Sequence, residues 1–299
     1  MDSIEPGEHG LARGDPSPQS RAGPREALSV AIASGKGGTG KSFLATGLGI
    51  VASRRGYRCT LVDADFGLAV DHLLLGCQPS RNLQDFLEGR ADALQVRTPA
   101  VGGLHLVPGA TGVAELASPG RAELGRFGVG MSEWGRDADL LLVDTGAGIQ
   151  AAVVATVAAA DVAVFVVQPE IASLTDAYAL MKLLLRRPGP APIFGVVSNR
   201  TAGPEVGRAS FEKLAEVARK FLGVTLHYLG GVSDEPAVTP RRLGSPPLVH
   251  THPECRTSAE MTAILSRLEV IAGGIRQRAR VEGVDSLAAR LLRQLPRSN

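Results

Sequence analysis

Seven short apolar runs occur along the chain between residue 28 and about residue 270. They are rich in Val, Leu and Ile and contain few polar residues, which is typical of strands that are buried on both faces of a parallel sheet. We therefore expect strands at residues 28–34, 58–65, 104–109, 139–146, 161–169, 192–200 and 225–231.

Segments with helical periodicity lie between these runs. A chain that alternates strand and helix makes right-handed crossovers and lays its strands parallel in one sheet. The predicted fold class is therefore α/β, with a doubly wound, mostly parallel sheet flanked by helices. We find no composition shift inside residues 27–272 and expect one domain there. The clearest predicted helices are Lys41–Arg54, Ile149–Ala159, Ala172–Arg187 and Gly207–Leu222.

The first 26 residues differ in composition from the rest of the chain. They are rich in Pro, Gly, Ser and charged residues, and they lack the apolar core of a signal peptide. Such a segment cannot bury enough apolar surface to offset its conformational entropy, so residues 1–26 are predicted to be a disordered tail. A tail that binds a partner is the alternative.

Residues 273–299 form a third region, a basic amphipathic segment with six Arg and two acidic residues from Arg276 onward. Two interpretations of this segment remain open. A helix within residues 284–295 contacts an anionic membrane surface peripherally, or it docks on its own domain. Docking is slightly favoured because the helix is short and has no Trp or Phe to anchor it. The expected apolar face consists of Leu287, Leu291, Leu292 and Leu295.

The bulk composition excludes several classes of protein. The formal charge of +2 over 299 residues does not by itself favour nucleic acid or a membrane as a partner. Cys59, Cys77 and Cys255 lie far apart, which predicts neither a disulfide framework nor a paired metal site and is consistent with a reducing cytosol. No uncharged apolar run reaches 18 residues, so no transmembrane helix is expected. We predict a cytoplasmic location, with peripheral contact at the inner face of the cell membrane as a further expectation.

The strongest chemical motif is SGKGGTGKS at residues 34–42, directly after the first predicted strand. It matches G-x-x-x-x-G-K-[ST], a phosphate-binding loop, and it opens a predicted helix as that motif requires. Backbone N–H groups of such a loop surround phosphate oxygens, and the helix dipole points its positive end at the same place. We expect Lys41 to reach the β- and γ-phosphates and the Ser42 hydroxyl to bind Mg²⁺. The predicted nucleotide-binding loop comprises Gly35, Lys36, Gly37, Gly38, Thr39, Gly40, Lys41 and Ser42.

Carboxylates follow two of the other apolar runs. Asp63 and Asp65 end the second predicted strand, and period-two alternation puts both on one face at the carboxyl end, where ligands bind in such sheets. The apolar residues 140–143 lead into Asp144, which is a Walker B pattern. Beside a phosphate-binding loop, Asp144 is expected to hold Mg²⁺ through water, and Gly146 to present its N–H to the γ-phosphate.

The second lysine of the loop narrows the assignment, because K-G-G-x-G-K-S resembles the deviant loop of the MinD/ParA-type ATPases. The resemblance implies their P-loop fold, ATP and Mg²⁺ as ligands, and an ATP-bound homodimer in which Lys36 reaches the partner's phosphates like an arginine finger. It makes Asp65 the residue that positions the attacking water and Asp63 a neighbour of the Mg²⁺ hydration shell. It also makes Asn199 and Arg200 an adenine-binding corner in which Asn199 contacts the base. The implied catalytic residues are Lys36, Lys41 and Asp65, and the metal-associated residues are Ser42, Asp63 and Asp144.

Longer segments resemble the flagellar-number branch of this family, called FlhG, FleN or YlxH. They are DADFGLA at residues 63–69, DTGAGI at 144–149 and PEIASLTDAYALMK at 169–182. Over residues 28–270 the resemblance implies a switch that dimerises with ATP, hydrolyses it slowly and regulates flagellar number or placement. The partners it implies are an FlhF-type GTPase, proteins of the flagellar switch complex or a transcriptional activator. Nucleic acid is not an expected partner.

Other functions remain open. A MinD-like division-site switch or a ParA-like partitioning ATPase is the main alternative. An iron–sulfur carrier would need clustered cysteines and a tyrosine kinase a C-terminal tyrosine cluster, and the sequence has neither. A scaffold that binds ATP without turnover conflicts with the joint presence of Lys36, Asp65 and Asp144. The chain departs from the branch at residues 67–72, which read G-L-A-V-D-H where the family reads G-L-A-N-x-D. This departure leaves the partner surface open.

Overall fold

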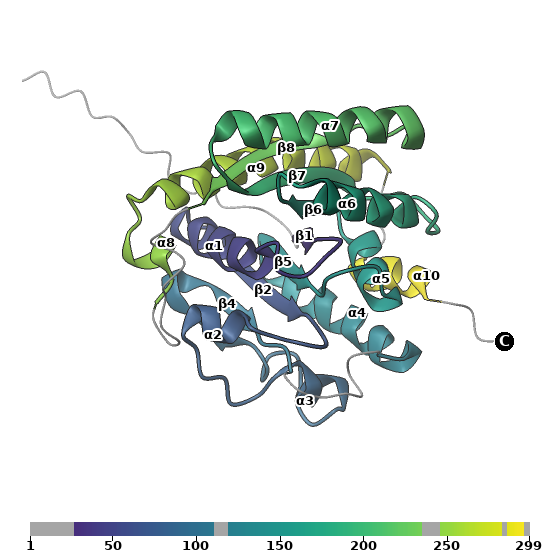
Figure 1. Cartoon of the computed structure of the whole chain (residues 1–299). Coiled ribbons are helices and arrows are strands. Elements are labelled where there is room, and N and C mark those ends of the chain that lie inside the picture. The colour runs from purple at the N-terminus through teal and green to yellow at the C-terminus, as the bar shows by residue number, and fades with distance from the viewer. Residues whose placement is uncertain (1–26, 111–118, 235–245, 283–285, 296–299) are drawn as a thin grey trace, which may run out of the picture.

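The structure is a computed structural model that describes residues 27–110, 119–234, 246–282 and 286–295. The tail predicted for residues 1–26 lies outside the described residues. In the described part of the chain, one sheet of eight strands lies between two layers of helices (Figure 1). The strands are β1 (Leu28–Ala33), β2 (Cys59–Ala64), β3 (Thr98–Pro99), β4 (His105–Val107), β5 (Leu140–Thr145), β6 (Val162–Val167), β7 (Ile193–Thr201) and β8 (His227–Ser233).

The sheet is doubly wound around its central strand. The strand order is β3-β4-β2-β5-β1-β6-β7-β8. The chain forms β2, β3 and β4 on one side, returns to place β5 between β2 and β1, and then adds β6, β7 and β8 on the other side. All neighbouring strands are parallel except the short pair β3 and β4 at one edge. The predicted fold class is confirmed, and each of the seven predicted strands is present. The two-residue strand β3 was not predicted.

The helices match the predicted pattern where the pattern was clear. The first predicted helix has its predicted bounds, and the other three begin and end within three residues of theirs. The helices are α1 (Lys41–Arg54), α2 (Asp71–Leu75), α3 (Leu83–Leu87), the 3-10 turn η1 (Val101–Gly103), α4 (Arg121–Arg136), α5 (Ala151–Ala159), α6 (Ile171–Leu184), α7 (Pro204–Leu222), α8 (Leu248–Thr251), α9 (Arg256–Glu282) and α10 (Leu287–Gln294).

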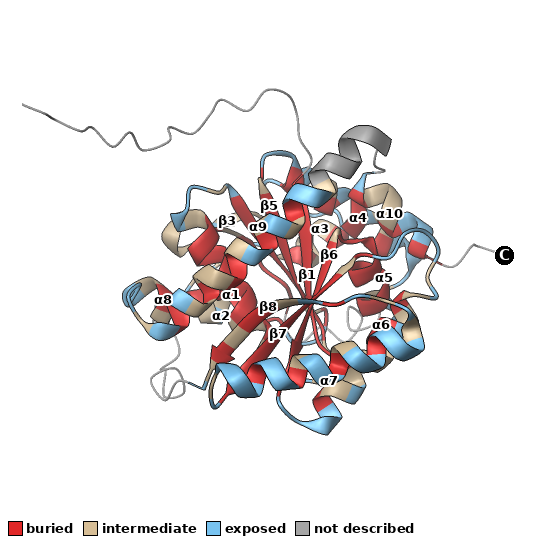
Figure 2. Cartoon of the chain, turned by 90° about the horizontal axis from the view of Figure 1, so that it is seen from above, coloured by how far each residue is buried: buried red, intermediate tan, exposed pale blue. Residues whose placement is uncertain are grey.

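Both faces of the sheet are buried. In β1, Val30 and Ile32 pack into a core shared with α1 and α9, whereas Ala31 and Ala33 pack on the opposite face with α5 and α6. Every residue of β1 is buried, and Figure 2 shows the buried strands between helices whose exposed faces point outward. This two-sided burial is the physical reason for the continuous apolar runs in the sequence.

The C-terminal helix α10 docks on its own domain. Leu287 and Leu291 are buried in a core shared with α4 and α5, whereas Leu292 is 46% exposed. Leu295, directly after the helix, is also buried. The prediction that Leu292 shares the buried face was therefore wrong. At 100° per residue, Leu292 lies 100° further round the helix than Leu291, whereas Leu291 shares a face with Leu287 four residues earlier. Of the two interpretations of this segment, the structure shows the docked helix.

A glycine in α4 makes this docking possible. A Cβ at Gly128 would lie 3.2 Å from Cδ2 of Leu291 and 3.5 Å from Cα of Ala288, so a side chain there would crowd α10. Arg290 of α10 forms an ion pair with Asp161, which also accepts hydrogen bonds from the backbone and hydroxyl of Ser29 at 2.9 and 2.6 Å. The helix is thus held by apolar packing and by a largely buried ion pair.

Helix α9 crosses the expected division at residue 273. It runs without a break from Arg256 to Glu282, and a Cβ at Gly273 or Gly274 would meet nothing within 4 Å. Each glycine in an exposed helix costs about 1 kcal/mol relative to alanine. The buried residues Met261 and Ile264 pack the helix against the core and offset this cost. Of the helices in the described ranges, none combines the length and the apolar character needed to cross a bilayer.

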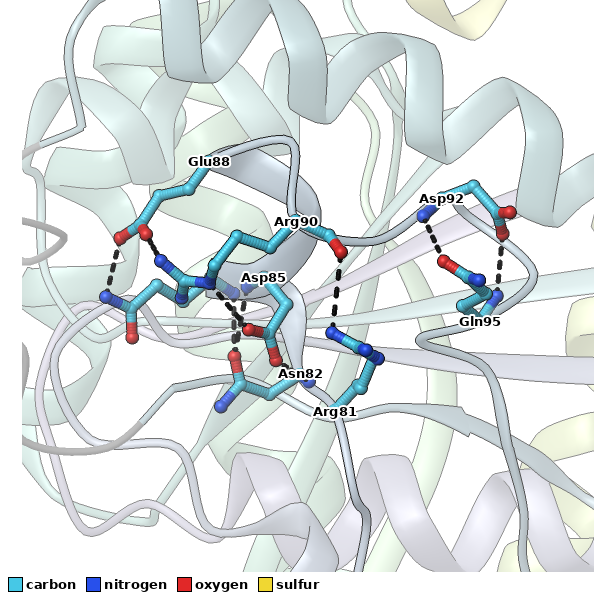
Figure 3. Close-up of polar contacts among 8 residues, drawn as sticks. Arg81, Asn82, Asp85, Glu88, Arg90, Asp92 and Gln95 are labelled. Atoms are coloured by element: carbon cyan, nitrogen blue, oxygen red, sulfur yellow. Dashed lines mark hydrogen bonds and ion pairs between the residues drawn. The ribbon is translucent and has the colours of Figure 1, made fainter.

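The short helix α3 is held by local polar contacts (Figure 3). The Asn82 side chain accepts hydrogen bonds from the backbone N–H groups of Gln84 and Asp85, and the Asp85 carboxylate accepts one from the Asn82 N–H. Arg90 folds back to form ion pairs with Asp85 and Glu88. This capping box fixes the start of the helix, and the buried side chains of Leu83 and Leu87 pack its other face on the core.

Candidate nucleotide-binding site

The predicted phosphate-binding loop joins β1, in the middle of the sheet, to α1. Gly38 and Gly40 have φ angles of 77° and 93°, a region that glycine enters without strain. Helix α1 begins directly afterwards at Lys41. A Cβ at Gly40 would lie 2.1 Å from Nδ2 of Asn199, so this position also has no room for a side chain. The glycine pattern therefore follows from the backbone conformation of the loop and from its close neighbours.

Side chains from the ends of neighbouring strands hold the loop. The Asn199 amide donates a hydrogen bond of 2.7 Å to the backbone oxygen of Thr39. The Gln168 amide donates one of 3.4 Å to the backbone oxygen of Gly38. Asn199 lies near the end of β7 and Gln168 directly follows β6, so two neighbouring strands of the rigid sheet position the loop.

The second lysine of the loop lies at its rim. The Lys36 side chain is one-third exposed, and its Nζ lies 2.8 Å from Oε2 of Glu170, just before α6. The Ser34 hydroxyl donates a hydrogen bond of 2.7 Å to the Lys36 backbone oxygen. At Gly35, a Cβ would come within 2.3 Å of the backbone carbon of Asp176 in α6. The lysine is thus carried on a segment that packs closely against the start of α6.

Two of the predicted carboxylates lie side by side. Asp63 in β2 and Asp144 in β5 are direct partners in the register of these parallel strands. They share strand parity with Leu61 and Leu142, which belong to the core that α1 covers. Both carboxylates are therefore on the α1 face, and both are buried, with 1% exposure each. The sequence predicted both strand ends, and the structure brings them together.

Burial raises the pKa of Asp63 and of Asp144 to about 7. The neighbouring charge of Asp144 raises the pKa of Asp63 further. The hydrogen bonds that Asp63 accepts from the backbone N–H groups of Asp65 and Asp71 lower it. For Asp144, a hydrogen bond from Ser42 and the charge of Lys41 lower the pKa against the effect of burial. Positive charge introduced here would favour the ionised carboxylates.

Asp65 lies in a turn beyond β2 and is less buried than Asp63. Its Oδ1 accepts hydrogen bonds from the backbone N–H groups of Gly67 and Leu68 at 3.1 and 3.0 Å. Its own N–H donates to Oδ1 of Asp63 at 3.2 Å. A Cβ at Gly146 would lie 3.6 Å from Oδ1 of Asp65, so these two predicted site residues are neighbours. The Asp65 carboxylate thus also shapes its own turn, which the sequence did not indicate.

Of the two residues predicted to bind adenine, Asn199 contacts the phosphate-binding loop, and Arg200 is exposed beside it. Asn199 is buried and bonded to the backbone of Thr39, as described above. Arg200 is exposed, with a φ of 53° that is unusual for a residue other than glycine. In the structure Asn199 holds the loop, whereas the backbone of Arg200 departs from regular strand conformation.

Two acidic residues at the site were not among the predicted site residues. Glu170 is the ion-pair partner of Lys36. Asp71, the first residue of α2, is fully buried, and its N–H donates a hydrogen bond of 3.0 Å to Oδ2 of Asp63. Burial and the nearby carboxylates raise the pKa of Asp71. One feature of the sequence could have indicated Asp71. Residues 67–72 read G-L-A-V-D-H instead of the family's G-L-A-N-x-D, which places a carboxylate shortly after the end of a strand.

The chemistry of these side chains fits Mg²⁺. Oδ1 of Asp144 is buried and has no hydrogen-bond partner in the described structure. Since buried polar atoms are normally paired, this oxygen is suited to bind a cation or water. The Ser42 hydroxyl lies beside the same carboxylate. Carboxylate and hydroxyl oxygens are the donors that Mg²⁺ prefers. Asp144 and Ser42 are therefore the residues that would hold it.

A central strand, a loop with two left-handed glycines, a helix that begins at a buried lysine and a strand-end carboxylate together define a P-loop nucleotide-binding protein. Residues 30–239 match the CobQ/CobB/MinD/ParA nucleotide binding domain, and the chain belongs to this family. The family predicted from the deviant loop is confirmed. Membership supports nucleotide binding and, in general terms, ATP hydrolysis.

Curated relatives cover most of the chain. It is 35% identical over 240 residues to the antiactivator FleN of Pseudomonas aeruginosa, which covers 80% of this chain and 85% of FleN. It is 35% identical over 209 residues to the flagellum site-determining protein YlxH of Helicobacter pylori, covering 69% of each chain. The predicted resemblance to the branch of FleN and YlxH is therefore confirmed.

Solved structures of MinD proteins have the same fold. MinD of Pyrococcus horikoshii complexed with Mg-ADP superimposes with a TM-score of 0.69 at 23% identity, covering 83% of this chain and 98% of that one. The MinC:MinD complex of Aquifex aeolicus gives a TM-score of 0.66 at 26% identity, covering 81% and 96%. These likenesses agree with the sheet topology described above.

Proposed function

We propose that this protein is an ATP-dependent dimerising switch that regulates flagellar number or placement. The observation that carries the switch is Lys36, a second loop lysine that lies accessible at the rim while Lys41 is buried in the loop. The flagellar role is supported by 35% identity to an antiactivator and to a flagellum site-determining protein. A MinD-like or ParA-like positioning role is the alternative within the same mechanism.

The loop and its neighbours bind the nucleotide. Residues 35–42 surround the phosphates with backbone N–H groups, and Lys41 neutralises the charge of the β- and γ-phosphates. The Gly146 N–H donates to the γ-phosphate, and Asn199 with Arg200 contacts the adenine. Asn199 is suited to this role because it already packs on the loop through Thr39.

Hydrolysis uses the carboxylate beside Gly146. Asp65 accepts a hydrogen bond from a water molecule and orients it for in-line attack on the γ-phosphorus, and the bond from this phosphorus to the bridging oxygen breaks. Bound Mg²⁺ would supply charge neutralisation at the phosphates, held by Ser42 and Asp144 with Asp63 close to its water shell. Asp65 is suited to orient water because its turn places it against Gly146.

Dimerisation completes the site. We propose that Lys36 leaves Glu170 and reaches the phosphates bound by the partner subunit, where it stabilises the charge that develops in the transition state. Hydrolysis is slow because this lysine and the attacking water must be ordered together. A partner that orders them would speed hydrolysis, and an FlhF-type GTPase, a switch-complex protein or a transcriptional activator is proposed for this role.

Contact with a membrane requires α10 to be released. In the described structure Leu287 and Leu291 are buried against the domain and Arg290 is paired with Asp161, so of the apolar side chains of α10 only Leu292 is exposed enough to meet lipid. We therefore propose a cytoplasmic resting protein, with peripheral contact through residues 284–295 confined to a form in which α10 has left its site. Co-sedimentation with anionic vesicles in the presence of ADP or ATP tests this step.

Light scattering tests the switch directly. The molar mass of the full chain is measured with ADP and then with ATP and Mg²⁺, for the wild type and for Lys36→Ala. We expect a monomer with ADP, a doubled mass with ATP, and no doubling for Lys36→Ala. A mass that does not respond to nucleotide would refute the switch and favour an ATP-binding scaffold.

Counting flagella tests the cellular role separately. Source cells that lack the protein are complemented with the wild type or with Lys41→Ala, and flagella are counted by electron microscopy. We expect altered flagellar number or position without the protein, restored by the wild type alone. Normal flagella combined with misplaced division septa would support the MinD-like alternative instead.

A further inference from the structure

Three buried carboxylates converge beside the loop, and the nucleotide-binding roles above use only two of them. One oxygen each from Asp63, Asp71 and Asp144 lies within 4.8 Å of the other two. The three residues come from β2, from the first position of α2 and from β5, and their exposures are 1%, 0% and 1%. The fold thus gathers three acids from separate elements at one buried point.

Asp71 is directed into this cluster without a side-chain partner. The hydrogen bond from its backbone N–H to Oδ2 of Asp63 folds the start of α2 back onto the end of β2. Among the described residues, neither Oδ1 nor Oδ2 of Asp71 has a hydrogen-bond partner, and Oδ1 of Asp144 has none either. Buried polar atoms are normally paired, so three unpaired oxygens at one point indicate a missing ligand.

The local charge balance favours a cation as this ligand. Asp63, Asp71 and Asp144 carry three negative charges when ionised, and Asp65 adds a fourth close by. The charge of Lys41 acts on Asp71 and Asp144 and offsets part of this sum. Buried charges without compensation are costly, and a divalent cation would compensate most of the remainder.

The spacing suits one six-coordinate ion. Oxygens bound to Mg²⁺ at about 2.1 Å lie about 3 to 4 Å from one another in an octahedron. Three carboxylate oxygens within 4.8 Å of one another can reach this arrangement with small side-chain rotations. A larger ion with about 2.4 Å bonds would also fit, but the few ligands favour an ion that keeps several waters.

We propose that Asp63, Asp71 and Asp144 form a three-carboxylate site that binds Mg²⁺ or Mn²⁺ in the protein without nucleotide. Asp71 is the decisive residue, because it adds a third carboxylate that the phosphate-binding loop and the two strand ends do not supply. The cation is then present before ATP arrives, next to Ser42. This site extends the proposed function, but its occupancy does not require ATP binding.

Electron paramagnetic resonance with Mn²⁺ tests the site on the nucleotide-free full chain. The wild type is expected to bind one Mn²⁺ per chain, and Mg²⁺ is expected to displace it. Asp71→Asn keeps the size of the side chain but removes its charge, and it should weaken binding at least about tenfold. Asp92→Asn removes an exposed carboxylate from a remote turn and should bind Mn²⁺ like the wild type.

Two results would overturn the proposal. One is a nucleotide-free wild type that binds no Mn²⁺ at millimolar concentration, and the other is an Asp71→Asn variant with wild-type affinity. If Asp71→Asn does not fold, Asp71→Ser and the wild-type titration still decide. Because no nucleotide is present, a protein that failed to bind ATP or to dimerise would still give a valid result. The two proposals can therefore fail separately.

Discussion

Lys36 and Glu170 form an ion pair within one protomer, with Nζ and Oε2 separated by 2.8 Å. The pair joins the phosphate-binding loop to the residue just before α6. A lysine that is to reach the phosphates of a second subunit must first leave this carboxylate. The ion pair therefore opposes dimerisation to a small degree, and its strength can be measured.

Replacing Glu170 with Gln should make dimerisation easier. The Lys36 and Glu170 side chains are 33% and 58% exposed, and exposed ion pairs contribute about 0–1 kcal/mol. We expect the ATP concentration at half-maximal dimer to fall by up to about fivefold, because 1 kcal/mol corresponds to that factor. Light scattering at a series of ATP concentrations measures this midpoint.

A matched control removes the charge of another exposed glutamate that forms no part of the nucleotide-binding loop. Glu216 is exposed on α7, and Glu216→Gln should leave the midpoint unchanged. The double variant Lys36→Ala with Glu170→Gln should fail to dimerise like Lys36→Ala alone. A Glu170→Gln protein that needs more ATP than the wild type would show that Glu170 assists the dimer.

Asp65 should be required for hydrolysis but not for binding. Asp65→Ala removes the carboxylate that is proposed to orient the attacking water, so we expect ATP binding to persist, hydrolysis to fall about 100-fold or more, and the dimer to accumulate. Lys41→Ala should abolish nucleotide binding itself. Phosphate release, measured together with binding of a fluorescent ATP analogue, distinguishes these two losses.

Asp65 also stabilises its own turn, and this contribution to structure can be separated from its proposed role in orienting water. Its Oδ1 accepts hydrogen bonds from the N–H groups of Gly67 and Leu68, and Asp65→Asn keeps an oxygen for them. We expect Asp65→Asn to be as stable as the wild type and yet inactive in hydrolysis. Hydrolysis at the wild-type rate in either variant would exclude Asp65 as the residue that positions water.

The strands and the loop could be predicted from sequence because each depends on local pattern. Burial on both faces produces continuous apolar runs, and the loop needs glycine at Gly38 and Gly40 for its positive φ angles. Helix α4 escaped prediction because glycines lower its propensity, while one of them, Gly128, is needed for the approach of α10. Long-range packing, which no local pattern encodes, decides that position.

The residues of the site could be predicted where one strand or one loop determines their position, but the contacts between elements could not. Period-two alternation placed Asp63 and Asp65 at one strand end, but the register that sets Asp63 beside Asp144 depends on pairing residues 81 positions apart. Asp71 joins them through the start of α2, and Glu170 meets Lys36 because β6 and β1 are neighbouring strands that end at the same edge. These relationships arise from tertiary structure, so the sequence could name residues but not their partners.

The free energy of unfolding should depend on pH through the buried carboxylates. The pKa of Asp63 and of Asp144 is about 7 in the fold and 3.8 as the reference value, so the folded, metal-free protein binds more protons than the unfolded chain between these pH values. Their contribution to stability is therefore full below pH 3.8 and is lost as pH rises to about 7. Thermal unfolding without metal should give a higher Tm near about pH 5.5 than near about pH 8.

Asp144→Asn tests the origin of this dependence. The amide does not titrate, so the difference in Tm between the two pH values should shrink relative to the wild type. Mg²⁺ should also shrink the wild-type difference, because a bound cation stabilises the ionised carboxylates. An Asp144→Asn protein with the full wild-type difference would show that other groups cause the pH dependence.

Two adjacent leucines of α10 should differ sharply in their contribution to stability. Leu291 is buried against α4 near Gly128, whereas Leu292 is 46% exposed. We expect Leu291→Ala to lower the free energy of unfolding by about 2–5 kcal/mol, since it removes buried apolar contacts and leaves a cavity. Leu292→Ala should change it by less than about 0.5 kcal/mol. Urea denaturation of both variants measures the difference, and equal effects would contradict the docked position of α10.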